Sequence, residues 1–385
     1  MMRVGVALPT PSDRKVSSMN PKRTAHHWRR GVAVLASTAL LLGGGAALAA
    51  DDSDKTTLPT GMTDVDGQET PILGTFIYHQ FHDDTNPEIR GIVHGVRRVE
   101  GGTALYYSIG TPAGADAAKF TGAMAFPNST FPYKSIHAVD LKLIDSTGLV
   151  GYRPLYDADT TFTSIVSDLD AAVGDLRVGF AMFPELPPDV TTVQVVMPWG
   201  TAAGDFPVED GPLEPVGDDP APLLGEGWPA IPDGADLAGA DPADVTHPLM
   251  RRSGDAQGTT ETEESPEQVS TTLDANVLFA KASADLSAAA QEALAAVAAD
   301  ISARGTGEVV VTGHTDSDGS DATNQTLSEQ RAAAVLAVLQ QGSGSAVTFT
   351  SVGKGESEPV ASNSTDEGKQ QNRRVTVVYS VQGES

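Results

Sequence analysis

An aspartate and an arginine in the stretch "GHTDSDGSDATNQTLSEQRAAAV" (residues 313–335) have the types and the spacing to hold a small zwitterion. Asp316 lies in a predicted turn, and Arg331 follows 15 residues later on a predicted helix. A carboxylate accepts hydrogen bonds from an ammonium group, and a guanidinium group pairs with a carboxylate through two parallel hydrogen bonds. We expect the two side chains to bind opposite charges on one ligand; the alternative is an ordinary surface ion pair between them.

The elements that must position these side chains form a strand–helix alternation in residues 271–382. The first helix is predicted to begin after the N-cap Ser287 and to end at Gly305, because its apolar residues recur at i, i+3, i+4 and i+7. A second helix is predicted from about Thr326 to Gln340. Strands are predicted at residues 276–280, 308–313, 347–353 and 373–381. This β-α-β-α-β-β order indicates an α+β domain with helices on one face of a mixed sheet.

Four motifs appear in a fixed order in this segment: "VLF", "GHTDSDGS", "LSEQRAAAV" and "VGKGESEPVASNSTDEGKQQNRRV". The series resembles the OmpA-like C-terminal peptidoglycan-binding family over about residues 273–380. The resemblance implies that the domain binds the stem peptide of peptidoglycan without covalent chemistry, mainly through its diaminopimelate residue. That residue presents an ammonium and a carboxylate on one carbon, which agrees with the chemistry expected of the aspartate and the arginine.

The resemblance assigns ligand-binding positions to five residues of this chain. The family's aspartate and helix arginine fall on Asp316 and Arg331, and Asn324, Thr315 and Arg373 fall on positions that support them. The resemblance implies no catalytic residue, no cofactor and no metal.

One departure from the family pattern concerns the rim of the expected site. The family usually has an acidic residue after the phenylalanine of its first motif, where this chain has Ala280 after Phe279. A contact to the ligand's amine is therefore expected to be missing, and the neighbouring Lys281 is expected to alter the rim.

The first fifty residues read as a targeting sequence. A basic stretch precedes the apolar run "GVAVLASTALLLGGGAALA" (residues 31–49), which ends in a small-x-small cleavage pattern. We therefore predict a signal peptide at residues 1–50 and an exported protein of the cell wall, periplasm or cell envelope. The alternative is an uncleaved membrane helix, since the run with Ala50 reaches about the length of a membrane span. No cysteine follows the run, which excludes a lipoprotein anchor.

The charge of the chain limits its partners. The sequence has 25 Lys and Arg against 51 Asp and Glu, a formal net charge of −26, and residues 1–50 hold 7 of the basic and 1 of the acidic residues. The remainder carries a net charge of −32 and repels phosphates. We expect no nucleic acid partner. The absence of cysteine also excludes disulfides and thiolate metal sites.

Residues 72–208 are rich in short strand-like runs separated by turn formers. Their spacing predicts a mostly β, sandwich-like domain of immunoglobulin type, with a single helix at residues 164–176. The flanking residues 51–71 are polar and turn-rich, and they are predicted to be disordered. Residues 209–270 are acidic and Pro-rich, so they are predicted to form an extended linker.

Two patterns suggest metal binding. The string "DSDGSD" (residues 316–321) departs from a calcium-binding EF-hand loop, because Asp321 and Leu327 occupy the positions of its required Gly and Glu. His79, His82 and Asp83 lie close together, but residues three apart on a strand point to opposite faces. No metal site is expected from either.

The sequence thus predicts a non-enzymatic wall protein that binds peptidoglycan and displays a β-rich domain, which is open to a protein partner. The alternative is a wall-anchored enzyme or metal-dependent module whose activity lies in the β-rich domain, with His79, His82 and Asp83 acting together.

Overall fold

The computed structural model describes residues 60–381, apart from 116–118, 127–131, 134–135, 159, 199–201, 257 and 345. The predicted signal peptide, residues 1–50, lies outside the described residues. Within the described part of the chain, no helix combines the length and the apolar character of a membrane span.

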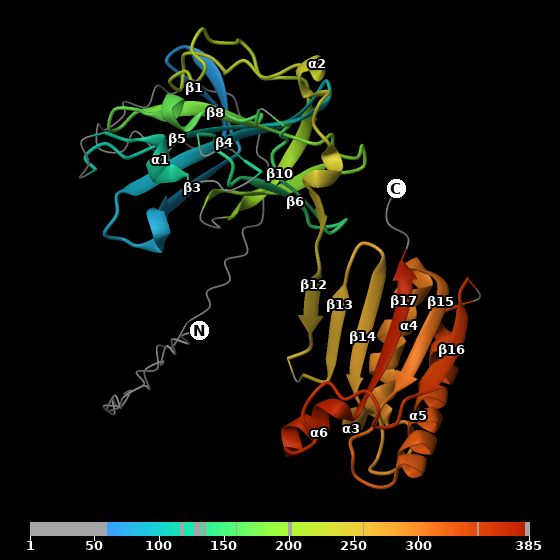
Figure 1. Cartoon of the computed structure of the whole chain (residues 1–385). Helices are drawn as coiled ribbons and strands as arrows, with labels where there is room; N and C mark the ends of the chain where they lie inside the picture. The colour runs from blue at the N-terminus through green and yellow to red at the C-terminus, as the bar shows by residue number, and fades with distance from the viewer. Residues whose placement is uncertain are drawn as a thin grey trace, which may run out of the picture. The chain divides into compact units, whose positions relative to one another are not determined.

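The strands of the β-rich region (residues 60–249) form a hairpin and a larger sheet (Figure 1). The hairpin joins β1 (Gly61–Val65) to β2 (Gln68–Ile72). In the described residues the larger sheet has nine strands in the order β11-β7-β6-β9-β10-β4-β5-β8, and β3 pairs with β4. These strands are β3 (Gly74–His79), β4 (Glu88–Val99), β5 (Gly102–Gly110), β6 (Lys142–Asp145), β7 (Val150–Tyr152), β8 (Leu176–Phe183), β9 (Thr192–Val196), β10 (Ala202–Asp210) and β11 (Thr246–Pro248).

One apolar core joins the part of the sheet that contains β5 and β8 to the part that contains β6 and β9. Leu105 and Phe183 from β5 and β8 are fully buried in the same apolar cluster as Leu143 and Val195 from β6 and β9. Strand β10 joins the halves, because it pairs with β9 and then, through Asp210 and its neighbours, with β4. The region is strand-rich as predicted. Eight of its described strands follow one hydrogen-bonded path, and β3 branches from β4, whereas the predicted sandwich has two packed sheets.

The helix predicted at residues 164–176 is wrong. Ile165 forms a bridge to His137, and only a short 3₁₀ turn, η2 (Val166–Leu169), follows. Gly174 has a φ of 96°, which interrupts a right-handed helix, and strand β8 begins two residues later. The helical spacing of the apolar residues arose from an irregular segment that buries Leu169.

Residues 51–71 were predicted to be disordered. This prediction is wrong from Gly61 onwards, because the β1–β2 hairpin forms there. The predicted linker at residues 209–270 is also wrong. Its first part contains the short helices α2 (Gly234–Leu237) and η4 (Pro242–Asp244). Trp228 is 1% exposed and packs in one cluster with Leu237 and Val245, so a few well-placed apolar residues fix a segment whose composition indicated an extended chain.

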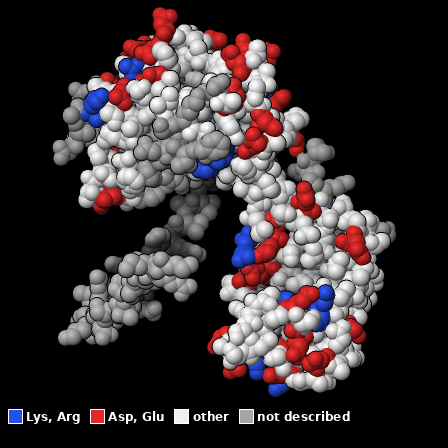
Figure 2. Space-filling view, in the orientation of Figure 1, with Lys and Arg blue, Asp and Glu red and all other residues white. Residues whose placement is uncertain are grey.

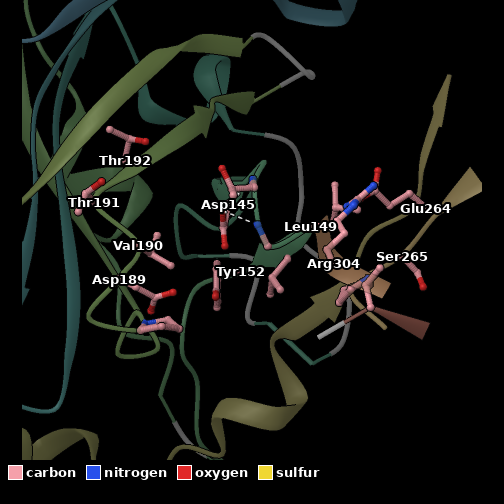
Figure 3. Close-up of a pocket in the computed structure, with 16 residues that line it drawn as sticks. Asp145, Leu149, Tyr152, Asp189, Val190, Thr191, Thr192, Glu264, Ser265 and Arg304 are labelled. Carbon is pink, nitrogen blue, oxygen red and sulfur yellow. Dashed lines mark hydrogen bonds and ion pairs between the residues drawn. The ribbon is translucent and has the colours of Figure 1, made fainter. Parts of the chain in front are cut away.

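The second part of the predicted linker forms strands of the C-terminal region (residues 251–381). Oppositely charged residues face each other across β12 (Arg251–Gly254) and β13 (Thr260–Glu264), which lowers the repulsion that composition alone predicts. Glu264 accepts hydrogen bonds from Arg251 and from Arg304 of the neighbouring helix, and Figure 3 shows the contact with Arg304. Burial opposes the charged form of Glu264, but these bonds prevail and lower its pKa.

The C-terminal region is a six-stranded mixed sheet with two long helices on one face (Figure 1). The strand order is β12-β13-β14-β17-β15-β16; within this sheet β15 and β16 pair in parallel, and the other neighbouring strands pair antiparallel. Its other elements are β14 (Gln268–Asp274), α3 (Ala275–Leu278), α4 (Ala288–Arg304), β15 (Gly305–Gly313), α5 (Asp321–Gly342), β16 (Thr348–Gly353), α6 (Asp366–Asn372) and β17 (Arg374–Val381). Buried residues of α4, α5 and the sheet form its core.

Capping residues explain where several of these helices begin. Ser287 caps α4 by accepting a hydrogen bond from the Ala290 amide, as predicted. The strand predicted at residues 276–280 is wrong, because the side chain of Asp274 accepts from the Asn276 amide and starts α3 there. The strand in question is β14, immediately before it. Helix α6, capped by Thr365, was not predicted.

Candidate ligand-binding site

A cavity of about 570 Å³ lies at one end of the C-terminal sheet. All five residues predicted to bind the ligand line this cavity, so the structure brings them together. Its lining residues are Asn276, Phe279, Ala280, Lys281, Ala282, Thr315, Asp316, Asp318, Asn324, Leu327, Arg331 and Arg373.

Strand register places these residues at the same end. Asp274 at the end of β14 pairs with Arg374 at the start of β17, and Gly313 at the end of β15 pairs with Val375 and with Gly353 of β16. The chain leaving β15 therefore enters the His314–Asp316 turn beside the residue that precedes β17, and α5 then returns across the sheet. Gly313 permits close contact, because a Cβ there would lie 2.2 Å from the Ser328 carbonyl oxygen of α5.

Asp316 is held by Arg373 and not by Arg331, its partner in the alternative interpretation. Its Oδ2 accepts a hydrogen bond from Arg373 Nη1 at 2.5 Å, and its Oδ1 accepts from the Asp318 amide at 3.1 Å. The carboxylate is 9% exposed as a side chain. The surface pair between Asp316 and Arg331, which was the alternative to ligand binding, does not form in the structure. Two of the roughly four acceptor positions of the carboxylate remain for a ligand.

Arg331 is a buried cation without a carboxylate partner among the described residues. It is 5% exposed, its Nε donates to the Ser283 carbonyl oxygen at 3.0 Å, and its guanidinium carbon lies 5.1 Å from the centre of the Phe279 ring. Burial and then the nearby Arg373 lower its pKa, although an arginine stays charged at neutral pH. The remaining guanidinium nitrogens are thus placed to bind an anion in the cavity.

Asn324 and Thr315 complete the inner wall. Asn324 Nδ2 donates to the Asp316 carbonyl oxygen at 3.1 Å and to Glu356 Oε2 at 2.6 Å, so it fixes the turn against the first part of α5. Thr315 is 4% exposed, and its hydroxyl has no hydrogen-bond partner among the described residues. A buried hydroxyl without a partner is costly.

Several lining residues were missed from sequence. Asp318 accepts a hydrogen bond from Lys369 at 2.7 Å, which lowers the pKa of Asp318. Asn276 accepts from Arg373 Nε at 3.0 Å and so steadies the arginine that holds Asp316. These contacts join α3 and α6 to the turn, and neither element was predicted there. Ala280 and Lys281, in contrast, line the cavity at the rim where the departure from the family pattern indicated them.

The alternative metal site gains no support. His79 ends β3, and its Nδ1 is 2.8 Å from the Asn86 carbonyl oxygen, while Asp83 bonds to Thr85 in a local turn. Among the described residues, no group of three or more His, Cys, Asp or Glu could hold a metal ion. Asp321, the last residue of the calcium-like string, begins α5.

The C-terminal region is similar to known proteins. Residues 278–373, about a quarter of the chain, match the model of the OmpA family. Outer membrane porin F of Pseudomonas fluorescens is 47% identical over 76 residues, which are 20% of this chain and 23% of the porin. The peptidoglycan-binding protein ArfA of Mycobacterium bovis is 37% identical over 102 residues, which are 26% of this chain and 31% of ArfA. The chain thus spans less than a third of either relative.

A solved structure of the cell wall anchor of the T6SS from Pseudomonas aeruginosa is also similar. It has 32% sequence identity and a TM-score of 0.30, and the match covers 32% of this chain and 88% of that one.

Proposed function

Because residues 278–373 form an OmpA-family domain, we propose that this protein is a non-enzymatic cell-envelope protein that binds peptidoglycan stem peptides through the cavity beside Asp316. The observation that carries the proposal is the arrangement of that cavity. A carboxylate with free acceptor positions and a buried guanidinium without a carboxylate partner among the described residues line one space. The chemistry of these groups matches an amino-acid centre.

Diaminopimelate supplies such a centre at the end of its side chain. In the proposed complex its ammonium donates to Asp316, and its carboxylate accepts from Arg331. Each charge-assisted hydrogen bond contributes about 1.5–3 kcal/mol. Arg331 stabilises the complex most, because a ligand carboxylate there neutralises a cation that is desolvated in the free protein. Arg373 keeps Asp316 in place, and Asn324 and Thr315 hold the turn and bind the ligand's polar edge.

The targeting sequence and the β-rich region have proposed roles that agree with this site. Residues 1–50 would direct export, and the β-rich region would be displayed in the cell envelope and be open to a protein partner. The acidic surface, part of which is visible in Figure 2, disfavours nucleic acid and leaves the cavity as a local cationic site. The relative named as a peptidoglycan-binding protein supports the choice of ligand.

A peptidoglycan pull-down tests the proposal. The Asp316→Ala/Arg331→Ala double variant should lose retention on insoluble peptidoglycan. A matched control removes Lys119 and Asp170, an exposed ion pair of the β-rich region, and should be retained like the wild type. Circular dichroism would verify that both variants fold. Unchanged retention of a folded Asp316→Ala/Arg331→Ala variant would refute the proposal.

The Arg331→Lys variant separates charge from geometry. Lysine keeps the positive charge but cannot form two parallel hydrogen bonds with a carboxylate. It should weaken binding less than Arg331→Ala does, and binding equal to that of the wild type would contradict bidentate recognition.

A further inference from the structure

The cavity contains one cation that the proposed recognition of an amino-acid centre does not use. Lys281 lines the cavity at its exposed rim, where its charge acts on Asp318. No carboxylate of the described residues forms an ion pair with Lys281, whereas Asp318 is paired with Lys369.

The backbone holds Lys281 at this rim. The amide of Ser283 donates to the Ala280 carbonyl oxygen at 3.0 Å, which closes a tight turn with Lys281 as its second residue. Ala282, the third residue of the turn, has a φ of 56°, as turns of this kind require. The carbonyl oxygen of Ser283 accepts the hydrogen bond from Arg331 Nε, so the turn is fastened to the buried arginine.

The charges of the cavity leave a positive excess. Asp316 is paired with Arg373, and Asp318 is paired with Lys369. Arg331 and Lys281 form no ion pair among the described residues, although the charge of Asp316 acts on Arg331 and the charge of Lys281 acts on Asp318. The cavity therefore has two cations outside any ion pair of the described residues, one buried and one at the rim, in a protein whose net charge is −26. A ligand with a single carboxylate neutralises only one of them.

We propose that Lys281 binds a second carboxylate of the ligand, so that the site selects stem peptides that end in diaminopimelate with both of its carboxylates free. Arg331 takes the carboxylate of the amino-acid centre, and Lys281 takes the carboxylate at the end of the peptide chain. This inference rests on the proposed function, because it requires the amino-acid centre to lie between Asp316 and Arg331. A stem peptide extended by a further residue, or capped as an amide, loses the charge that Lys281 recognises.

Calorimetric titration of the full chain with two synthetic tripeptides tests the inference. Both end in diaminopimelate with an intact amino-acid centre, and they differ only in a free or an amidated terminal carboxylate. At low salt the wild type should bind the free acid about three-fold more tightly, the size expected of an ion pair at an exposed rim. In Lys281→Ala this ratio should fall to about one while the affinity for the amide stays unchanged, and in Lys281→Glu the preference should reverse.

The control variant is Lys119→Ala, which removes the same charge far along the chain in the β-rich region and should keep the wild-type ratio. Salt near 0.5 M should reduce the ratio, because it screens exposed charges. Equal affinity of the wild type for both peptides, or an unchanged ratio in Lys281→Ala, overturns the inference and leaves the proposed function standing. Failure of the wild type to bind either peptide overturns both.

Discussion

Lowering the pH from about 7 to about 4 should destabilise the β-rich region through one buried histidine. His94 is 1% exposed and lies 5.0 Å, centre to centre, from the Trp228 ring. Its Nδ1 is 2.7 Å from the Pro71 carbonyl oxygen, which can only accept, so Nδ1 carries the proton and Nε2 accepts from the Ser108 hydroxyl at 2.9 Å. Burial lowers the pKa of His94 to about 4, and the bond to Pro71 offsets only part of this effect.

The direction follows from proton uptake. Between pH 6.5 and about 4 the unfolded chain binds a proton on His94 that the folded chain does not, so the free energy of unfolding falls as the pH falls through this window. One pKa unit corresponds to about 1.4 kcal/mol, and a pKa of about 4 in place of 6.5 therefore corresponds to a loss of about 3 kcal/mol. The stabilisation is fully present above the unfolded pKa.

Urea unfolding followed by tryptophan fluorescence measures this loss. The three tryptophans of the sequence, Trp28, Trp199 and Trp228, all precede the C-terminal region, so the signal does not report on that region. His94→Gln should be less stable at pH 7 and should lose about 3 kcal/mol less than the wild type between pH 7 and pH 4. The exposed His247, changed to Gln, is the control. Parallel pH profiles for wild type and His94→Gln would refute the reasoning.

Three further changes test other parts of the structure. Trp228→Ala should lower the free energy of unfolding by about 3–5 kcal/mol in urea unfolding followed by circular dichroism, because it empties a core in the segment predicted to be a linker. Gly313→Ala should cost about 1–3 kcal/mol by circular dichroism and weaken peptidoglycan retention, since its Cβ would press on the Ser328 carbonyl oxygen. Arg373→Ala should weaken retention less than Arg331→Ala does, since it leaves Asp316 free to bind the ligand; equal losses would show that Arg373 contacts the ligand directly.

The sequence predicted which residues meet at the candidate site but not how they pair. Motif order placed Asp316, Asn324 and Arg331 in one cavity, because a turn followed by a helix leaves few ways to arrange them. The partner of Asp316 is Arg373, which is 57 residues away along the chain and reaches Asp316 only through the pairing of β15 with β17. Local patterns carry no information about such register.

The sequence was least informative where the structure was predicted from average composition, because no periodic pattern of apolar residues was present. Residues 209–270 are acidic and rich in proline, yet Trp228 is buried and Glu264 is held by two arginines. Average composition does not reveal that a few apolar or charged residues have specific partners elsewhere. Conversely, the apolar spacing in residues 164–176 matched a helix by coincidence, and Gly174 with its left-handed backbone shows why none forms.

Only two residues, Leu249 and Met250, join β11 of the β-rich region to β12. If the cavity is bound to a fixed ligand and the N-terminal part of the chain is pulled, the force enters the C-terminal sheet at Arg251, at the open end of the β12–β13 hairpin. Arg251 lies at the end of the sheet opposite the cavity, so a pull between the two runs along the strands and loads the hydrogen bonds between β12 and β13 together. The cross-strand pairs Arg251–Glu264 and Arg252–Glu263 would then add to the resistance of these hydrogen bonds and keep the hairpin on the C-terminal sheet.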